Sequence, residues 1–164
     1  MSYHDTVYPM EPSQADFEYL LRLRTGLRRF LRWSEQQAQA AGLTSAQHQL
    51  LLAIRGHSAE ISPTIGELAE YLVLRHHSTG ELIDRAEAAG LVLRTPDPVN
   101  GTQVRVSLTA TGAAKLNRLA ETHMAELAHL APTMRALWDA LDDNASTAPR
   151  SLAAQAAGPS SPDA

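Results

Sequence analysis

The chain has 164 residues, of which 44% are hydrophobic and 20% charged, with a formal net charge of −4 and no cysteine. This length and apolar content are typical of one globular domain, and the absence of cysteine excludes disulfides, thiolate metal sites and thiol redox chemistry. No apolar run approaches about 18 residues, and the N-terminus MSYHDTVYPMEPS lacks the basic-then-apolar pattern of a signal peptide. We therefore expect a cytoplasmic protein without a membrane partner.

The N-terminal third predicts an arm followed by a long helix. Residues 1–13 contain two prolines and no helical period, whereas apolar residues recur every three or four positions from Gln14 to Ala41, where Gly42 ends the helix. Five arginines lie on this helix. They form either a solvated face with glutamate neighbours or part of a binding site for phosphate or an anionic aromatic ligand; they are Arg22, Arg24, Arg28, Arg29 and Arg32.

A second helix follows from Thr44 to about His57. Thr44 caps it and Gln47 completes the capping box three residues on. The short segment 60–63 then leads into the next helix, for which Thr64 and Glu67 form another capping box.

From Thr64 to Thr109 the sequence predicts two helices and a hairpin. The first helix ends at the turn Val73-Leu74-Arg75, and the second buries Leu82, Ile83 and Ala86 before Gly90 terminates it. Two alternating runs, 91–95 and 103–108, are strand-like and are joined by a loop containing an Asn-Gly pair. Two helices one turn apart followed by a hairpin indicate a winged helix-turn-helix, whose second helix enters the major groove of DNA.

The C-terminal part predicts a second long helix from Thr109, with apolar residues recurring to Leu130. We expect Pro132 to break it and residues 133–141 to form a last helix. A helix this long, whose apolar stripe a small domain cannot cover, suggests a partner. Residues 143–164 are rich in Ala, Ser and Pro without a period, which predicts a disordered tail.

Several short motifs together resemble the MarR family of bacterial transcriptional regulators. They are Leu68-Ala69-Glu70-Tyr71-Leu72, Leu82-Ile83-Asp84-Arg85, Ala89-Gly90-Leu91-Val92, Pro96-Asp97-Pro98 and Val106-Ser107-Leu108-Thr109-Ala110-Thr111-Gly112. Each is weak alone, but their order and spacing are specific, and the resemblance covers roughly residues 14–142.

The resemblance implies a mainly α fold with a small β-hairpin wing, in which residues 44–108 form the DNA-binding lobe. Residues 14–42 and 109–142 would then supply the helices that interlock two copies in a homodimer. A ligand-responsive repressor that binds a pseudo-palindromic operator is the implied function. Segment 60–63 would add a small third strand to the wing.

The candidate DNA-binding residues lie on the second helix of the motif and on the wing. The resemblance implies that the 75–81 run faces the groove, although Arg75 stands where the family usually has a small capping residue. The wing departs from the family because residues 100–103 replace its tip arginines. The full set is Arg75, His76, His77, Ser78, Gly80, Glu81, Arg85, Arg94, Asn100, Gly101, Thr102, Gln103 and Arg105. Arg94 could instead form a structural ion pair with Asp84 or Asp97.

The family places its effector pocket between the dimer helices and the lobe. The candidates implied here are Arg24, Arg28, Trp33, His48 and Leu52, with core or dimer packing as the alternative for Trp33. Neither His76 with His77 nor His123 with His129 has a spacing that shares one helix face, so we predict no metal and no cofactor. No GxSxG, HExxH or Gly-rich phosphate loop is present, and we do not expect an enzyme.

Two alternatives to a ligand-responsive DNA binder remain at this stage. Between Thr64 and Thr109 the sequence contains four arginines and six acidic residues. This acidic balance favours a winged helix used as a protein-interaction or dimerisation module. The histidine content also suggests a metal-responsive regulator, whose site would need ligands from distant parts of the chain such as His4 or Glu121.

Overall fold

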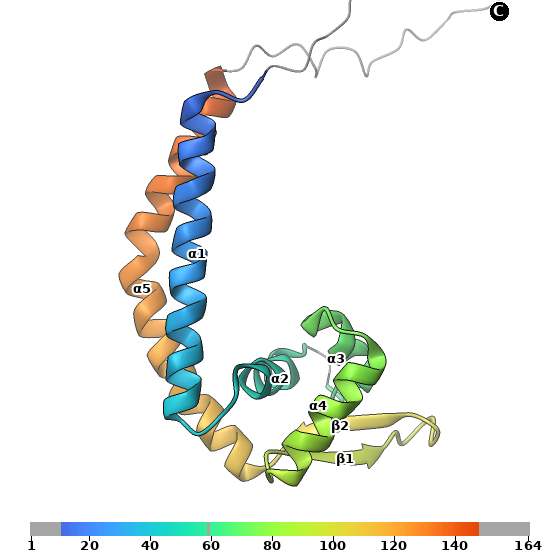
Figure 1. The fold of residues 1–164 in the computed structure, drawn as a ribbon. Helices are drawn as coiled ribbons and strands as arrows, with labels where there is room; N and C mark the ends of the chain where they lie inside the picture. Colours follow the sequence, from blue (N-terminus) through green and yellow to red (C-terminus); the bar gives the residue numbers. More distant parts are fainter. Residues whose placement is uncertain (1–10, 59, 148–164) are drawn as a thin grey trace, which may run out of the picture.

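The computed structural model of the protein describes residues 11–58 and 60–147. Within them the chain forms five helices and one antiparallel hairpin, as Figure 1 shows. The elements are α1 (Gln14–Ala40), α2 (Ser45–Gly56), α3 (Ile65–Leu72), α4 (His76–Ala88), β1 (Val92–Pro96), β2 (Val104–Leu108) and α5 (Ala110–Thr147). This confirms the predicted fold class, a mainly helical winged helix with long flanking helices.

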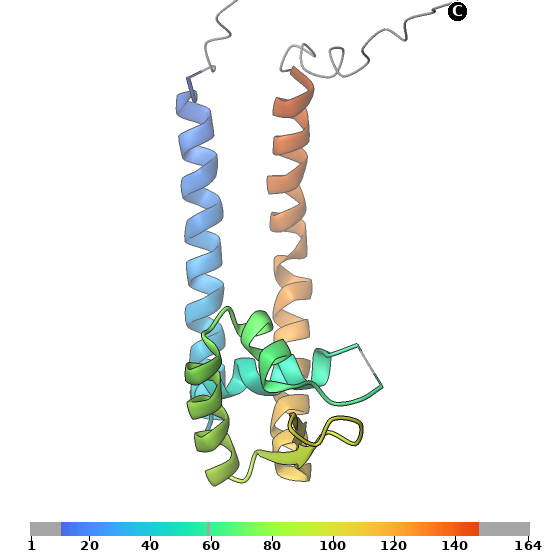
Figure 2. The same cartoon turned by 90° about the vertical axis from the view of Figure 1, so that its right-hand side faces the viewer.

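The molecule consists of a lobe and two long helices. Elements α2, α3, α4 and the hairpin form the lobe, and α1 and α5 project from it in the same direction, as the view turned by 90° makes clear (Figure 2). No helix in the described part of the chain is both long and apolar enough to span a membrane.

Local signals set the helix boundaries. Thr44 with Gln47 and Thr64 with Glu67 form the two predicted capping boxes, and Ser13 with Asp16 forms a third at the start of α1. Gly42 (φ 71°) and Gly90 (φ 70°) adopt the left-handed conformation just past the ends of α1 and α4. These predicted starts and stops are confirmed.

The core of the lobe is built from the helix faces predicted to be buried. Leu68 on α3 and Leu82, Ile83 and Ala86 on α4 lie against each other and against Leu50, Leu51, Val92 and Val106. Burial of these apolar side chains supplies the main driving force for the arrangement. It also fixes which side of α4 remains exposed.

The hairpin pairs Val92 with Leu108 at its base and Pro96 with Val104 towards its tip. Beside it, the Val106 N–H donates to the Pro63 carbonyl at 2.9 Å, and an isolated antiparallel bridge joins Thr64 to Arg105. Pro63 and Thr64 therefore add one bridge to the edge of the sheet, and segment 60–63 does not form the small third strand that the resemblance implied.

One predicted break is wrong. Pro132 lies inside α5, which runs unbroken from Ala110 to Thr147. Proline removes one N–H donor and crowds the carbonyl one turn earlier, but the alanines and leucines on both sides are strong helix formers and the helix continues through the defect. The helix therefore also includes residues 143–147, which the sequence assigned to the tail. Residues 1–10 and 148–164, the rest of the predicted arm and tail, lie outside the described residues.

Candidate functional site

The first turn of α4 is exposed and has no side-chain cap. Arg75 is the N-cap residue, and its side chain makes no capping hydrogen bond, as the sequence predicted. Arg75, His76 and His77 are all exposed. Backbone N–H groups at such a helix end lack intrahelical partners and attract anions.

The opposite side of α4 is anchored in the core. Thr79 is fully buried and its hydroxyl donates to the Arg75 carbonyl at 3.1 Å. Glu81, one turn on and exposed, lies 3.4 Å from the His77 ring. The helix thus presents Arg75, His76, His77 and Glu81 to solvent and holds them on a buried base.

The predicted wing residues 100–103 are exposed at the tip of the hairpin. The Asn100 side chain accepts from the N–H and the hydroxyl of Thr102, at 3.3 and 2.6 Å, so it shapes the loop itself. Thr102 and Gln103 line a hollow of about 280 Å³ together with His76 and the start of α3. The fold therefore brings the wing and the first turn of α4 to one surface.

Arg94 links β1 to α4. Its guanidinium donates to Asp84 (2.6 Å), Glu87 (2.7 Å) and the Gly80 carbonyl (3.2 Å), and its backbone N–H donates to Glu87. Of the two acidic partners considered from the sequence, Asp84 is the one it contacts. This arginine is engaged in holding the wing against the helix.

Arg105, on β2, is also engaged within the lobe. It pairs with the buried Asp97 carboxylate and donates to the Ser62 carbonyl at 2.6 Å. Asp97 in turn accepts from the backbone N–H groups of Asn100 and Val99, and these bonds together with Arg105 hold its pKa below the ordinary value.

The other two arginines of the lobe motif, Arg75 and Arg85, are exposed and form no ion pair with a described residue. Among the predicted residues they are therefore the cations available to an external anion. The acidic balance of the motif counted against DNA binding in the sequence. In the structure three of its acidic residues, Asp84, Glu87 and Asp97, are paired with arginines of the lobe, so their negative charges are partly neutralised.

A cavity of about 980 Å³ lies between α1, α2 and α5. Of the predicted effector residues, Arg28, His48 and Leu52 line it, whereas Arg24 and Trp33 do not. Trp33 packs against Phe30 and His123, with ring centroids 5.9 and 4.9 Å away, which fits the packing alternative. The wall also contains Ser34, Arg32, Glu35 and His123.

His123 is the residue that sequence reasoning missed for this cavity. It was considered only as a metal ligand, because the helical period of α5 places it on a face without showing which helix covers that face. In the described residues no group of three or more His, Asp or Glu side chains is arranged to hold a metal ion.

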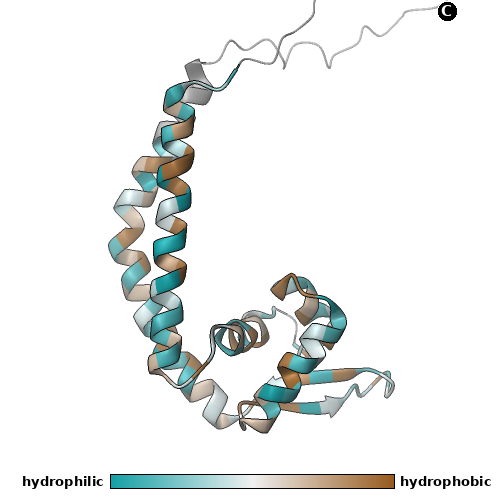
Figure 3. Ribbon diagram, viewed as in Figure 1, coloured by the Kyte–Doolittle hydropathy of each residue, from teal (hydrophilic) through white to brown (hydrophobic). Residues whose placement is uncertain are grey.

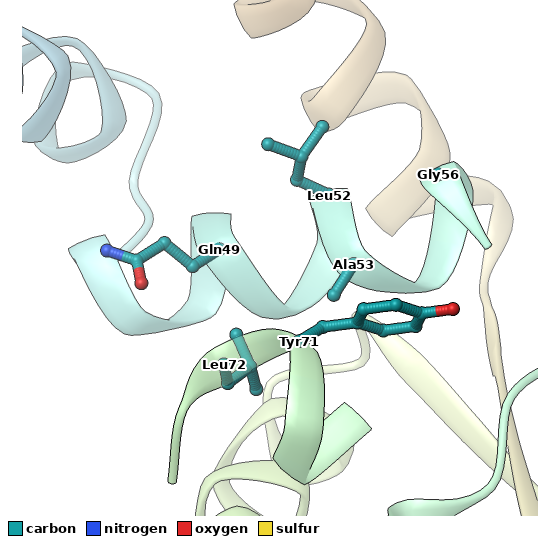
Figure 4. Close-up of a pocket in the computed structure, with 6 residues that line it drawn as sticks. All are labelled: Gln49, Leu52, Ala53, Gly56, Tyr71 and Leu72. Atoms are coloured by element: carbon teal, nitrogen blue, oxygen red, sulfur yellow. The ribbon is translucent and has the colours of Figure 1, made fainter. Parts of the chain in front are cut away.

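A second, smaller cavity of about 290 Å³ lies between α2 and α3. Figure 4 shows Tyr71 and Leu72 on α3 below Ala53 of α2, with Leu52 directed away from them. The Tyr71 hydroxyl is 2.9 Å from the His57 ring nitrogen. No sequence motif pointed to this site.

The two-helix unit, its turn and the paired strands define a winged helix-turn-helix protein. Residues 41–101, which span most of the lobe, match the family model of the MarR family. The model match lies in the winged helix lobe, and the resemblance seen in the sequence is confirmed.

Solved structures of transcription regulators share the fold. The transcriptional repressor CouR bound to a 23-mer DNA duplex is 24% identical with a TM-score of 0.62, covering 82% of this chain and 99% of its own. MepR, a transcription regulator of the Staphylococcus aureus multidrug efflux pump MepA, is 16% identical with a TM-score of 0.64, covering 79% and 96%. AbsC from Streptomyces coelicolor is 18% identical with a TM-score of 0.60, covering 84% and 99%. A search of the curated proteins finds no match.

Proposed function

We propose that this protein is a ligand-responsive transcriptional repressor that binds a pseudo-palindromic DNA operator as a homodimer. The exposed, uncapped first turn of α4, with Arg75 at its start, is the observation that carries this proposal. A helix end with free N–H groups, an adjacent cation and a wing on the same surface suits the phosphates and base edges of a major groove. The DNA-bound CouR structure, whose fold this chain shares, supports it.

The long helices favour a second copy of the chain as partner. On α1 the side chains of Phe17, Leu20, Leu21, Leu27 and Leu31 are exposed, and on α5 those of Met124, Leu127 and Trp138. Brown, apolar segments recur along both helices in Figure 3. Packing these two helices against their counterparts would remove the apolar area from water and set the spacing of two α4 helices.

We assign direct DNA contact to Arg75, His76, His77, Ser78, Gly80, Glu81 and Arg85 and to wing residues 100–103. Arg94 and Arg105 act indirectly, because their guanidinium groups already bind carboxylates within the lobe. A guanidinium with free donors can bind a phosphate or the O6 and N7 atoms of guanine. Arg75 and Arg85 are therefore the main candidates for such contacts.

The 980 Å³ cavity is the proposed effector site. It has apolar walls from Leu31, Leu52 and Leu116, and two arginines, Arg28 and Arg32, at its α1 side. An aromatic ligand with an anionic group suits this combination. Because the cavity touches both the lobe and the long helices, a ligand that prefers one lobe orientation would shift DNA affinity by its differential affinity for the two states.

The decisive experiment measures binding to the DNA upstream of the protein's own gene across a salt series. We expect saturable, sequence-selective binding whose affinity falls with salt. Arg75→Ala should weaken it by about fivefold or more, in line with the loss of a direct contact worth about 1–3 kcal/mol. Arg118→Ala, which removes an exposed arginine from α5, is the matched control and should change little.

One observation favours a second candidate function. Both wing arginines are engaged within the lobe and the wing tip carries none, so a protein-interaction or dimerisation module would need no further explanation. Salt-insensitive or absent binding to any DNA, together with an intact dimer in light scattering, would select this alternative. Selective binding that is unchanged in Arg75→Ala would keep the regulator and remove Arg75 from its contacts.

A further inference from the structure

We propose that His48 and His123 form an acid-sensitive joint between the winged helix lobe and the long helices, which reorients the lobe when the pair becomes charged. This inference rests on the proposed function, because the consequence of reorientation is weaker DNA binding. It assigns to the cavity a regulation by protons, independent of any effector.

The two histidines lie where three helices meet. His48 projects from α2, the first helix of the lobe, and is buried. Its ring centroid is 4.9 Å from that of His123 on α5, and the ring planes are inclined by 48°. His123 in turn contacts Trp33 of α1 edge to face at 4.9 Å. Any force between the two rings therefore acts directly between the lobe and the long helices.

When the His123 ring is neutral, its hydrogen bonds determine which ring nitrogen carries the proton. Its Nδ1 lies 2.7 Å from the Leu119 carbonyl, and because a carbonyl only accepts, Nδ1 carries the proton. Its Nε2 then accepts from the Ser34 hydroxyl on α1, at 2.7 Å. Because a hydroxyl both donates and accepts, Ser34 can bind either form of the ring, and His123 links α1 to α5 in both.

His48 is the member of the pair that resists a charge. Burial lowers its pKa, and a charge on His123 lowers it further. None of the hydrogen bonds among the described residues involves its ring. The second proton, which would give the His48 ring its positive charge, therefore has no hydrogen-bond acceptor within the joint while the three helices stay packed.

The other charges around the cavity do not compensate. From α1, Arg28, Arg32 and Glu35 face it; from α2 and α5 the titratable groups are His48 and His123 alone. Two arginines against one glutamate leave a positive balance, which also disfavours additional protons. Two imidazolium rings at this spacing repel each other, and moving α2 away from α5 relieves the repulsion and admits water.

Trp33 provides a reporter of the joint that needs no DNA. The chain has two tryptophans, so Trp138→Phe leaves Trp33 as the only one. A protonated imidazole in edge contact quenches indole fluorescence. We expect a quenching transition on lowering the pH from about 8 to about 5, across the range in which histidine titrates. It should be lost in His123→Gln.

Two results would overturn the proposal that His48 and His123 form an acid-sensitive joint. One is Trp33 fluorescence that does not change over this range. The other is a transition that His123→Gln leaves intact. If His123→Gln fails to fold by circular dichroism, His123→Asn replaces it and should likewise abolish the transition. A transition that persists in His123→Asn also contradicts the proposal.

The functional half compares operator affinity of wild type and His123→Gln at each pH. His76 and His77, next to the proposed phosphate contacts, are present in both proteins, so their effect on binding cancels in the ratio. We expect wild type to lose affinity relative to the variant as the pH falls, by up to about tenfold for each unit by which the His48 pKa differs between bound and released forms. A constant ratio overturns the coupling to DNA. A Trp33 transition without DNA binding at any pH instead contradicts the proposed function and leaves the titrating joint supported.

Discussion

The guanidinium of Arg94, on β1, donates to the carboxylate of Asp84, on α4, across 2.6 Å, while a second nitrogen donates to Glu87 at 2.7 Å. Through these two bonds one side chain joins the base of the wing to the last turns of α4. The same contact places a positive charge beside two acidic groups of α4. Arg94 therefore both holds β1 against α4 and neutralises part of the negative charge of α4.

We expect Arg94→Ala to lower the free energy of unfolding by about 1–2 kcal/mol, because Asp84 and Glu87 are partly exposed and water replaces some of the lost bonds. Arg94→Lys should recover only part of this, since an ammonium cannot bind both carboxylates and the Gly80 carbonyl in one plane. Urea unfolding followed by circular dichroism, at one protomer concentration, measures both. Arg85→Ala is the control, and an equal loss there would contradict the role given to Arg94.

The turn between α3 and α4 contains strain that a substitution can remove. Val73 caps α3 with φ 53° and ψ 42°, a left-handed conformation that β-branched residues avoid, and the residue is 89% exposed. Val73→Gly should therefore raise the free energy of unfolding by about 0.5–1 kcal/mol, the strain relief exceeding the added entropy of the unfolded chain. Thermal unfolding tests this. Leu74→Gly, with no positive φ to relieve, should destabilise; stabilisation by both would reject the explanation.

Gly112, in the first turn of α5, lies directly against the Leu91 backbone. A Cβ at this position would overlap the Leu91 carbonyl oxygen and approach its carbon to 3.1 Å. Gly112→Ala must push α5 away from the end of α4, and we expect a loss of about 2 kcal/mol or more. Gly80→Ala, in a helix with open space at the new Cβ, should gain about 0.5–1 kcal/mol. Similar effects of the two substitutions on the melting temperature would contradict this packing argument.

Acid should unfold the lobe through two carboxylates. Backbone hydrogen bonds hold the pKa of Glu67 and of Asp97 below their ordinary values, from Thr64 in the first case and from Asn100 and Val99 in the second. Below those ordinary values the unfolded chain binds more protons than the folded one, so the stabilisation is complete above about pH 4.5 and is lost as the pH falls through the lowered values.

The measurement is the melting temperature between about pH 3 and pH 6. Asp97→Asn should lower it at neutral pH and flatten its acid dependence, because the amide oxygen can still accept from the backbone but no longer pairs with Arg105 or titrates. Glu70→Gln, at an exposed glutamate of α3, is the matched control and should keep the wild-type profile. An acid profile that Asp97→Asn leaves unchanged would be evidence against this assignment.

Pro132 and Arg94 illustrate where sequence reasoning stops. The predicted break at Pro132 was wrong. The free-energy cost of a proline in a helix is opposed by the helix propensity of all its neighbours, so the outcome depends on the whole segment. For Arg94 the sequence offered two acidic partners, and only the approach of β1 to α4 selects Asp84. His123 was considered for metal and lies instead against Trp33 and His48.

The amino-acid sequence alone determined the order of helices and strands, the capping boxes at Thr44 and Thr64, the helix ends at Gly42 and Gly90 and the buried face of α4. These features depend on hydrogen bonds and on the spacing of apolar residues within a few positions of each other, so they can be predicted from the sequence alone. The tertiary structure decided the contacts between distant segments: Arg105 with the Ser62 carbonyl, and Ser34 with His123. Such pairs depend on the angles at which helices cross, and those angles follow from packing of the whole core rather than from any local pattern.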